Sequence, residues 1–108
     1  MTRSFQVLEP AEIEIRQVVK EYDALRPGLG DNILTELDKR FEHIQEFPEA
    51  YQKTAHHFRS VELDSVPFKV YYVVSRLQIV VTGFVPSRSN PKKQLRMLKQ
   101  RYFLSTQY

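Results

Sequence analysis

The apolar positions near the N-terminus first alternate and then recur with a helical period. Residues 4–8, SFQVL, alternate between apolar and polar and predict a short first strand. Pro10 suits the first turn of a helix, because its missing N–H would have no partner there. From that point the apolar residues recur at spacings of three and four, which is typical of an amphipathic helix: Ile15, Val18, Val19, Tyr22 and Leu25.

A second helix is predicted after a short break. Residues 26–31, RPGLGD, contain a proline and two glycines, which interrupt the first helix. Asp31 is expected to cap the second helix, since its carboxylate accepts bonds from the free N–H groups at a helix start. Pro48 ends this helix, and the short connection predicts an antiparallel helical hairpin. The apolar stripe of the second helix comprises Leu34, Leu37, Phe41, Ile44 and Phe47.

After Pro48 the pattern is typical of strands. Residues 50–63 contain two weak candidates, AYQKTAHHF and RSVEL. Residues 68–74, FKVYYVV, and 77–85, LQIVVTGFV, are strong candidates, because they are rich in β-branched and aromatic side chains. Only Ser75 and Arg76 separate them, which predicts a tight hairpin. Nearly every position is apolar, so we expect central strands covered on both faces, or with one face covered by a partner.

These elements predict an α+β fold. An N-terminal strand and an antiparallel helical hairpin pack on a mostly antiparallel four-stranded sheet, and a basic C-terminal tail, residues 91–108, follows. Within this tail, residues 91–102 can form a helix through Leu95, Leu98 and Tyr102. The chain of 108 residues predicts one domain, residues 1–108.

Composition narrows the class of protein. The chain has no cysteine, which excludes a disulfide framework and a thiolate site. No apolar run reaches a membrane-spanning length, and the N-terminus lacks the pattern of a signal peptide. We therefore expect a cytoplasmic protein that does not act in a membrane.

The charges are unevenly distributed along the chain. Residues 1–64 hold all 13 acidic side chains and 8 of the 16 Lys and Arg residues, whereas residues 65–108 hold the other 8 and no acid. The C-terminal part should therefore give one face a positive field suited to phosphate or to an acidic partner. A solvated basic tail is the alternative interpretation.

The order of these features resembles the RelE/ParE superfamily of bacterial type II toxins. The resemblance covers residues 3–95 and rests on RPGLG between the helices, on FEHIQEFPEAY, on Arg59 ahead of VPFKVYYVV, and on an R-x-x-P sequence, Arg88 to Pro91, after the last strand. The spacing is most similar to the ParE-like, plasmid-stabilisation branch. The resemblance implies a growth-inhibiting toxin that a cognate antitoxin wraps and neutralises.

The family implies two modes of action. RelE-like members cleave mRNA on the ribosome without a metal, whereas ParE-like members poison DNA gyrase and hydrolyse nothing. We expect the ParE-like mode, with gyrase as target. A ribosome-dependent mRNA endoribonuclease is one alternative, and a non-toxic module that binds its antitoxin and co-represses the operon is another.

If the chain is a nuclease, four residues are candidates for its catalytic site. Arg88 matches the arginine that RelE-like members place after the last strand, where a guanidinium can hold a phosphate through two bonds. ParE-like chains often keep this arginine too. Lys69 stands where the nucleases carry another arginine, and in a strand it would share a face with Tyr71 and Val73. His56 and His57 are adjacent, so in a strand they would face opposite ways.

The departures from the nuclease pattern count against mRNA cleavage. The lysine pair of the nucleases is reduced to Lys53, and no tyrosine occurs in residues 91–95. Pro86 stands near the place where some members have a histidine. The chain thus lacks a full set of acid and base groups, which cleavage by 2′-hydroxyl attack requires.

The remaining cations are candidates for binding a partner or nucleic acid. Arg59 is so general in the family that we expect it to support the sheet or to pair with an acid of the helical hairpin. No cofactor is expected, and no side chains stand at metal-ligand spacing. Operator DNA would be bound only through the antitoxin, and a homodimer is a further candidate. Besides Arg59 and Arg88, the binding candidates are Lys92, Lys93, Arg96, Lys99 and Arg101.

Overall fold

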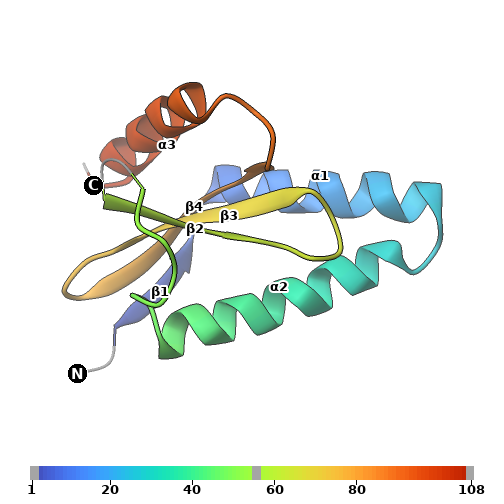
Figure 1. Ribbon diagram of the computed structural model, residues 1–108, viewed down its shortest axis with the longest axis horizontal. Helices are drawn as coiled ribbons and strands as arrows, with labels where there is room; N and C mark the ends of the chain where they lie inside the picture. Colours follow the sequence, from blue (N-terminus) through green and yellow to red (C-terminus); the bar gives the residue numbers. More distant parts are fainter. Residues whose placement is uncertain (1–2, 55–56, 107–108) are drawn as a thin grey trace.

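A computed structural model describes residues 3–54 and 57–106 of the chain. Within these residues three helices and four strands form, arranged as in Figure 1, and they confirm the predicted α+β class. In chain order they are β1 (Ser4–Val7), α1 (Glu9–Leu25), α2 (Leu29–Glu46), β2 (Phe58–Glu62), β3 (Phe68–Val74), β4 (Gln78–Pro86) and α3 (Pro91–Ser105).

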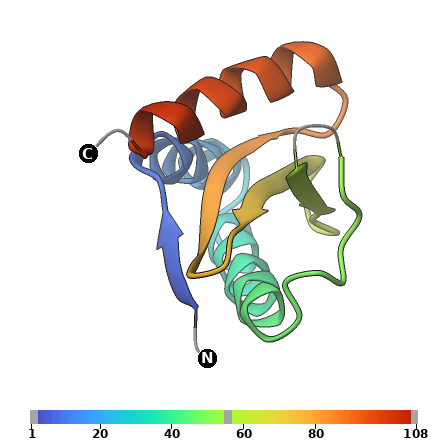
Figure 2. The same cartoon turned by 90° about the vertical axis from the view of Figure 1, so that its left-hand side faces the viewer.

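The strands form one mostly antiparallel sheet, as predicted. Its order is β1-β4-β3-β2, with β1 parallel to β4 and the other two pairs antiparallel. The helical hairpin formed by α1 and α2 lies on one face of this sheet and α3 lies on the other (Figure 2). Because the connection from β1 to β4 runs through the hairpin and the other two strands, it is long enough for β1 and β4 to run parallel.

The two faces of the central strands carry two separate apolar clusters. Alternate residues of β3, such as Val70 and Tyr72, pack under the helical hairpin, whereas Tyr71 and Val73 pack under α3. Both faces are therefore covered by the chain's own helices, one of the two arrangements that the apolar strands left open. The larger cluster also includes Ile15, Val18, Ile33, Leu37, Ile44, Ile79, Val81 and Phe84.

The expected N-cap of the second helix is wrong. The helix α2 begins at Leu29, and Asp31 lies in its first turn. A carboxylate from the preceding helix does the capping: Asp23 Oδ1 accepts bonds from the N–H groups of Gly28, at 3.0 Å, and Gly30, at 3.2 Å. Gly28 adopts a left-handed conformation, with φ of 99°, which glycine tolerates without a steric penalty.

Two strand boundaries also differ from the prediction. Among the described residues of the weak candidate at 50–58, only Phe58 belongs to a strand, and Lys53 forms a single bridge with Arg59. Residues 55 and 56 of this candidate lie outside the described residues. In the last hairpin β4 begins at Gln78, so three residues separate the strands instead of two.

Candidate functional site on the face covered by α3

The helix α3 is packed tightly against β4. Its N-cap is Asn90, whose side-chain oxygen accepts bonds from the N–H groups of Lys92 and Lys93. Leu98, fully buried, lies against Gly83: a Cβ added at Gly83 would stand 2.4 Å from Leu98 Cδ2. Glycine at this position therefore sets how closely the helix approaches the sheet. The predicted basic helix is confirmed, and it belongs to the folded domain.

An ion pair between α1 and α3 closes the edge of β4. Arg101 Nη1 lies 2.8 Å from Glu14 Oε1, and Arg101 Nη2 lies 2.9 Å from Glu14 Oε2. The ladder with β1 ends at Val81. Beyond it, the Phe84 N–H donates to Glu14 at 3.1 Å, and the Thr82 carbonyl accepts from Arg101 at 3.1 Å. The pair thus satisfies backbone groups that β1 does not reach.

Sequence reasoning placed Arg101 among the binding candidates and did not single out Glu14. The Arg101 side chain is 19% exposed and its guanidinium is engaged inside the molecule. The helical spacing does indicate that Glu14 is special, because it lies on the same face of α1 as the buried residues Ala11, Ile15 and Val18. An acid on the buried side of a helix requires a partner.

Among the nuclease candidates that the structure describes, His57 lies far from Lys69. His56 lies outside the described residues. Lys69 pairs with Glu62 at one end of the β2–β3 ladder, and His57 precedes Phe58 at the other end. Five residues at the rise of a strand separate positions 57 and 62, roughly 16 Å. An acid or base at His57 is therefore far from a phosphate held at Lys69.

Lys69 and Arg88 lie at the same end of the sheet. Phe68 pairs with Pro86, so the start of β3 adjoins the end of β4, and Arg88 is exposed in the turn that follows. The Lys69 ammonium lies 5.1 Å from the centre of the Tyr71 ring, which confirms that these two residues share a face.

Arg59 supports the backbone beside the sheet. Its Nη1 donates to the carbonyl of Tyr51 at 2.8 Å and to that of Glu49 at 3.3 Å. These bonds hold the segment after α2 against the edge strand β2. This matches the supporting role expected for an arginine at this position.

Exposed cations occupy the turn before α3 and the helix as far as Lys99. Five cations, which we call the α3 basic face, are all exposed, and none of them forms an ion pair with any described residue. The first turn of α3 contains no acid. The five residues are Arg88, Lys92, Lys93, Arg96 and Lys99.

The second half of α3 borders an apolar groove. The groove has a volume of about 710 Å³ and lies between the helix and the ends of β2 and β3. Its floor contains Phe58 and Val73, and Phe103 beside it is 61% exposed. His57, which adopts a left-handed φ of 68°, and Lys99 border it. The full lining is His57, Phe58, Val73, Val74, Ser75, Lys99, Tyr102, Phe103 and Thr106.

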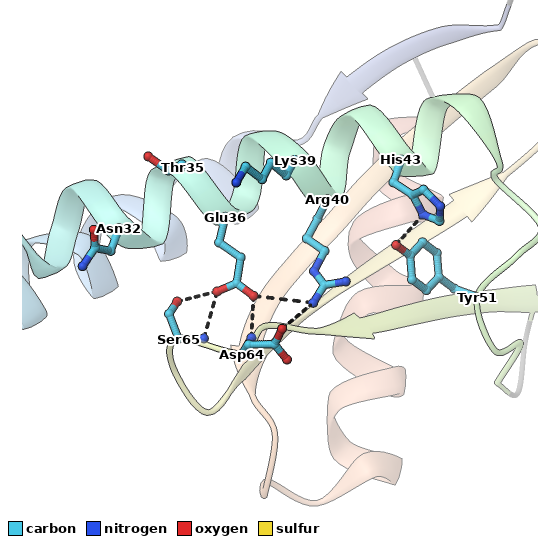
Figure 3. Close-up of a pocket in the computed structure, with 9 residues that line it drawn as sticks. All are labelled: Asn32, Thr35, Glu36, Lys39, Arg40, His43, Tyr51, Asp64 and Ser65. Carbon is cyan, nitrogen blue, oxygen red and sulfur yellow. Dashed lines mark hydrogen bonds and ion pairs between the residues drawn. The ribbon is translucent and has the colours of Figure 1, made fainter.

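A second concavity, on the opposite side of the sheet, is polar (Figure 3). It has a volume of about 650 Å³ and lies between α2 and the turn from β2 to β3. Glu36 accepts bonds from the N–H groups of Asp64 and Ser65 and from the Ser65 hydroxyl. Arg40 Nη2 lies 3.6 Å from Glu36 Oε2 and 3.2 Å from Asp64 Oδ2.

These contacts decide the charge state of Glu36. Burial alone would raise the pKa of its carboxyl, but the bonds from Ser65 and Asp64 and the charge of Arg40 outweigh burial, and the pKa lies below its usual value. The carboxylate therefore holds the turn as an anion. Because its polar groups bind one another, this concavity is better suited to fixing the turn than to binding a ligand.

Two tyrosines and a histidine form a further set of contacts near the end of α2. His43 Nδ1 lies 2.6 Å from the Tyr51 hydroxyl, and the Tyr51 ring packs edge-on against Tyr72. The Tyr72 hydroxyl donates to the Pro48 carbonyl at 2.7 Å. Burial raises the pKa of Tyr72 to about 12, although Arg59 acts in the opposite direction.

Neither a metal-binding cluster nor a membrane-spanning helix occurs in the part of the chain that the structure describes. Within residues 3–54 and 57–106, no three His, Cys, Asp or Glu side chains lie close enough together to hold a metal ion. In the same residues, no helix combines the length and the apolar character needed to cross a bilayer.

Comparison with known proteins supports the fold. No protein-family model matches the sequence, and no curated protein is significantly similar to it. Among solved structures, a chain from the chromosomal ParDE toxin–antitoxin system of P. aeruginosa superposes with a TM-score of 0.69. The match covers 79% of this chain and 96% of that chain, at 13% sequence identity. At this identity the likeness concerns the fold, and it confirms the RelE/ParE-like fold predicted from the sequence.

Proposed function

We propose that this chain is the toxin of a type II toxin–antitoxin module, a ParE-like growth inhibitor neutralised by a cognate antitoxin. The observation that carries the proposal is the fold likeness, because it spans 96% of a chain from a ParDE system. The order of motifs in the sequence, from RPGLG to R-x-x-P, supports it independently.

The apolar groove beside α3 supports the presence of a protein partner. A groove with an apolar lining and an exposed aromatic side chain, here Phe103, is typical of protein interfaces. The lining residues include His57 and Lys99 and no acid. An amphipathic acidic segment that folds on binding, as an antitoxin would supply, suits this combination of apolar floor and positive rim.

Gyrase poisoning fits the site better than mRNA cleavage. Cleavage by 2′-hydroxyl attack needs an acid and a base close to the cation that holds the phosphate. The distance between His57 and Lys69, together with the missing tyrosine near Arg88, argues against such a centre. We therefore propose a mode of action without hydrolysis, with gyrase as the target.

The proposal is tested by expressing the chain from a tight inducible promoter, with and without the protein encoded by the neighbouring gene. Colony counts, chromosomal breaks and mapped mRNA 5′ ends are measured in parallel. We expect growth arrest with double-strand breaks and a DNA-damage response, all suppressed by the antitoxin. Purified chain should also inhibit supercoiling by gyrase in vitro.

The three modes give different results. Site-specific mRNA cuts that disappear in Arg88→Ala would replace gyrase poisoning with a ribosome-dependent endoribonuclease. Absence of any growth effect in a native-like host, with retained antitoxin binding, would indicate the non-toxic module that co-represses its operon. Failure to bind any neighbouring gene product would contradict the toxin–antitoxin proposal itself.

A further inference from the structure

We propose that the α3 basic face binds the phosphate backbone of nucleic acid directly, without an antitoxin and without sequence preference. This goes beyond the proposed function and does not depend on it, since a chain can grip phosphates whether or not it is toxic. It rests on the positions of these cations, on their lack of ion-pair partners within the described residues, and on the absence of apolar side chains from the stripe that three of them form.

Three of the cations form one stripe along the helix. Lys92, Arg96 and Lys99 follow one another at spacings of four and three, so they project from the same side of α3. Seven residues of helix span about 10 Å. One strand of a duplex offers a phosphate about every 3.4 Å along its axis, so the stripe matches the length of roughly three phosphates.

None of these cations forms an ion pair within the described residues, in contrast to three other arginines of the chain. Arg16, Arg40 and Arg101 each lie within ion-pair distance of a carboxylate. The α3 basic face has no such contact, and residues 65–108 contain no acid that could supply one. The chain thus presents these charges to an external anion.

Two of the cations stand where the helix itself disfavours them. Lys92 and Lys93 occupy the first turn of α3, near the positive end of the helix dipole, where acids stabilise and cations destabilise. Their position therefore brings no benefit to the helix. A charge that costs stability in the free protein is explained if it is used in binding.

Nucleic acid suits this face better than an acidic protein does. The core of a protein interface is apolar and often aromatic, but the stripe from Lys92 to Lys99 is made of cations alone. The most exposed apolar side chains of α3, Phe103 and Leu104, lie at its other end, and Phe103 lines the groove. Met97, which is 36% exposed, lies on another side of the helix and contacts Arg101. Phosphate contacts need only cations, and they supply most of non-specific binding.

The test measures binding of the purified full-length chain to a fluorescein-labelled DNA duplex of about 20 base pairs and arbitrary sequence, as a function of salt. We expect affinity to fall about a hundredfold from about 50 to 200 mM salt, the dependence expected for roughly four phosphate contacts. The variant Lys92→Gln/Arg96→Gln/Lys99→Gln should lose at least about tenfold in affinity, and its log–log salt slope should be smaller by about three.

A matched control variant tests whether binding depends on the α3 basic face or only on the net charge of the chain. Lys20→Gln/Arg26→Gln/Lys39→Gln removes the same charge from exposed positions on the helical hairpin and its loop, and it should bind like the parent chain. Thermal unfolding of both variants verifies the fold; because Lys92 opposes the helix dipole, the α3 variant should not lose stability.

Several results would overturn the inference. These are absence of binding at low salt, an unchanged salt slope in the α3 variant, or equal losses in both variants. A poly-glutamate peptide of the same charge is the competitor for an acidic protein ligand. If it displaces the duplex at a lower concentration than unlabelled duplex does, the face binds acidic protein and the inference fails.

Discussion

Arg101 and Glu14, 87 residues apart in the chain, form a two-point ion pair at 2.8 and 2.9 Å that joins α3 to α1. The pair also bonds to the backbone of β4 at Thr82 and Phe84, where β1 no longer pairs with that strand. One contact therefore links three elements and closes a sheet edge. It makes the basic C-terminal segment part of the domain and leaves its outer side free for binding.

Removing one partner of this pair should destabilise the fold. Glu14→Ala removes the carboxylate partner of the Arg101 guanidinium and leaves the Phe84 N–H without its acceptor, and both groups are at least partly buried. We expect a loss of about 2 kcal/mol in the free energy of unfolding, measured by urea denaturation.

Glu12→Ala is the matched control for this substitution. Glu12 lies on the same helix, and its pair with Arg16 is exposed and 4.0 Å long. Such pairs contribute at most about 0.5 kcal/mol. A double-mutant cycle with Arg101→Met isolates the pair formed by Glu14; a coupling energy near zero would show that this ion pair does not hold α3.

The close approach of α3 to β4 predicts a cost for any side chain at Gly83. In Gly83→Ala the new Cβ would stand 2.4 Å from Leu98 Cδ2, and Leu98 is fully buried, so the helix or the side chain must move. We expect a loss of about 1–3 kcal/mol, measured by urea denaturation, as for other overpacked sites.

A second substitution distinguishes overpacking from a backbone effect. Leu98→Ala alone should cost about 2–4 kcal/mol through lost burial and a cavity. In the double variant the methyl group added at position 83 occupies part of that space, so the combined cost should be smaller than the sum of the two. Strict additivity would mean that the Gly83→Ala cost arises from the backbone and not from contact with Leu98.

Much of the fold follows from local patterns in the sequence. The three- and four-residue spacing of Ile15 and Val18, and the β-branched run that includes Val70 and Val73, specify a helix and a strand without reference to the rest of the chain. The local pattern left open what covers the second face of the strands. Packing settles this, because Leu98 of α3 fills that face.

Two features that sequence reasoning missed depend on contacts between different elements. Asp31 had the side chain of an N-cap, but Asp23 of the preceding helix bonds to the N–H groups instead. Sequence reasoning did not single out Glu36, whose partner Asp64 is 28 residues away in the chain. Local propensity describes one element at a time and does not report which polar groups meet after folding.

The Glu36 network predicts a loss of stability in acid. Because the pKa of Glu36 is lowered in the folded state, the unfolded chain binds the proton more tightly, and stability rises with pH in this range. The contribution is fully present above the ordinary value of 4.5 and is lost as the pH falls through the lower, folded value. Glu36→Gln should therefore lower the free energy of unfolding by about 2 kcal/mol at pH 7, and should change it little at a pH below the folded-state pKa of Glu36.

Chemical denaturation of both proteins at a series of pH values measures this difference. Glu42→Gln, an exposed change on the same helix, is the control, because the Glu42 carboxylate makes no ion pair with a described residue. It should differ little from the parent chain at any pH. A Glu36→Gln penalty that stayed constant down to acid pH would contradict the proposed anionic role of Glu36.

The buried hydroxyl of Tyr72 predicts the opposite behaviour in alkali. Its pKa is raised from 10 to about 12, so the neutral form is favoured by folding. Its contribution is fully present below pH 10 and is lost as the pH rises from 10 towards about 12. Tyr72→Phe removes the bond to the Pro48 carbonyl and should cost about 1 kcal/mol at neutral pH.

This penalty should disappear in alkali, because the ionised parent then has no hydroxyl proton to donate. Ultraviolet titration of tyrosinate in the folded protein measures the ionisation directly, and Tyr72→Phe should remove the component that titrates last. Tyr102→Phe is the control, since the Tyr102 hydroxyl makes no bond to a described residue, while its ring, which α3 contributes, packs against the apolar cluster beneath that helix. If Tyr72→Phe removed an early-titrating component instead, Tyr72 would be accessible to water, and the packing of the segment after α2 against β3 would be looser than its contacts with Tyr51 and Pro48 imply.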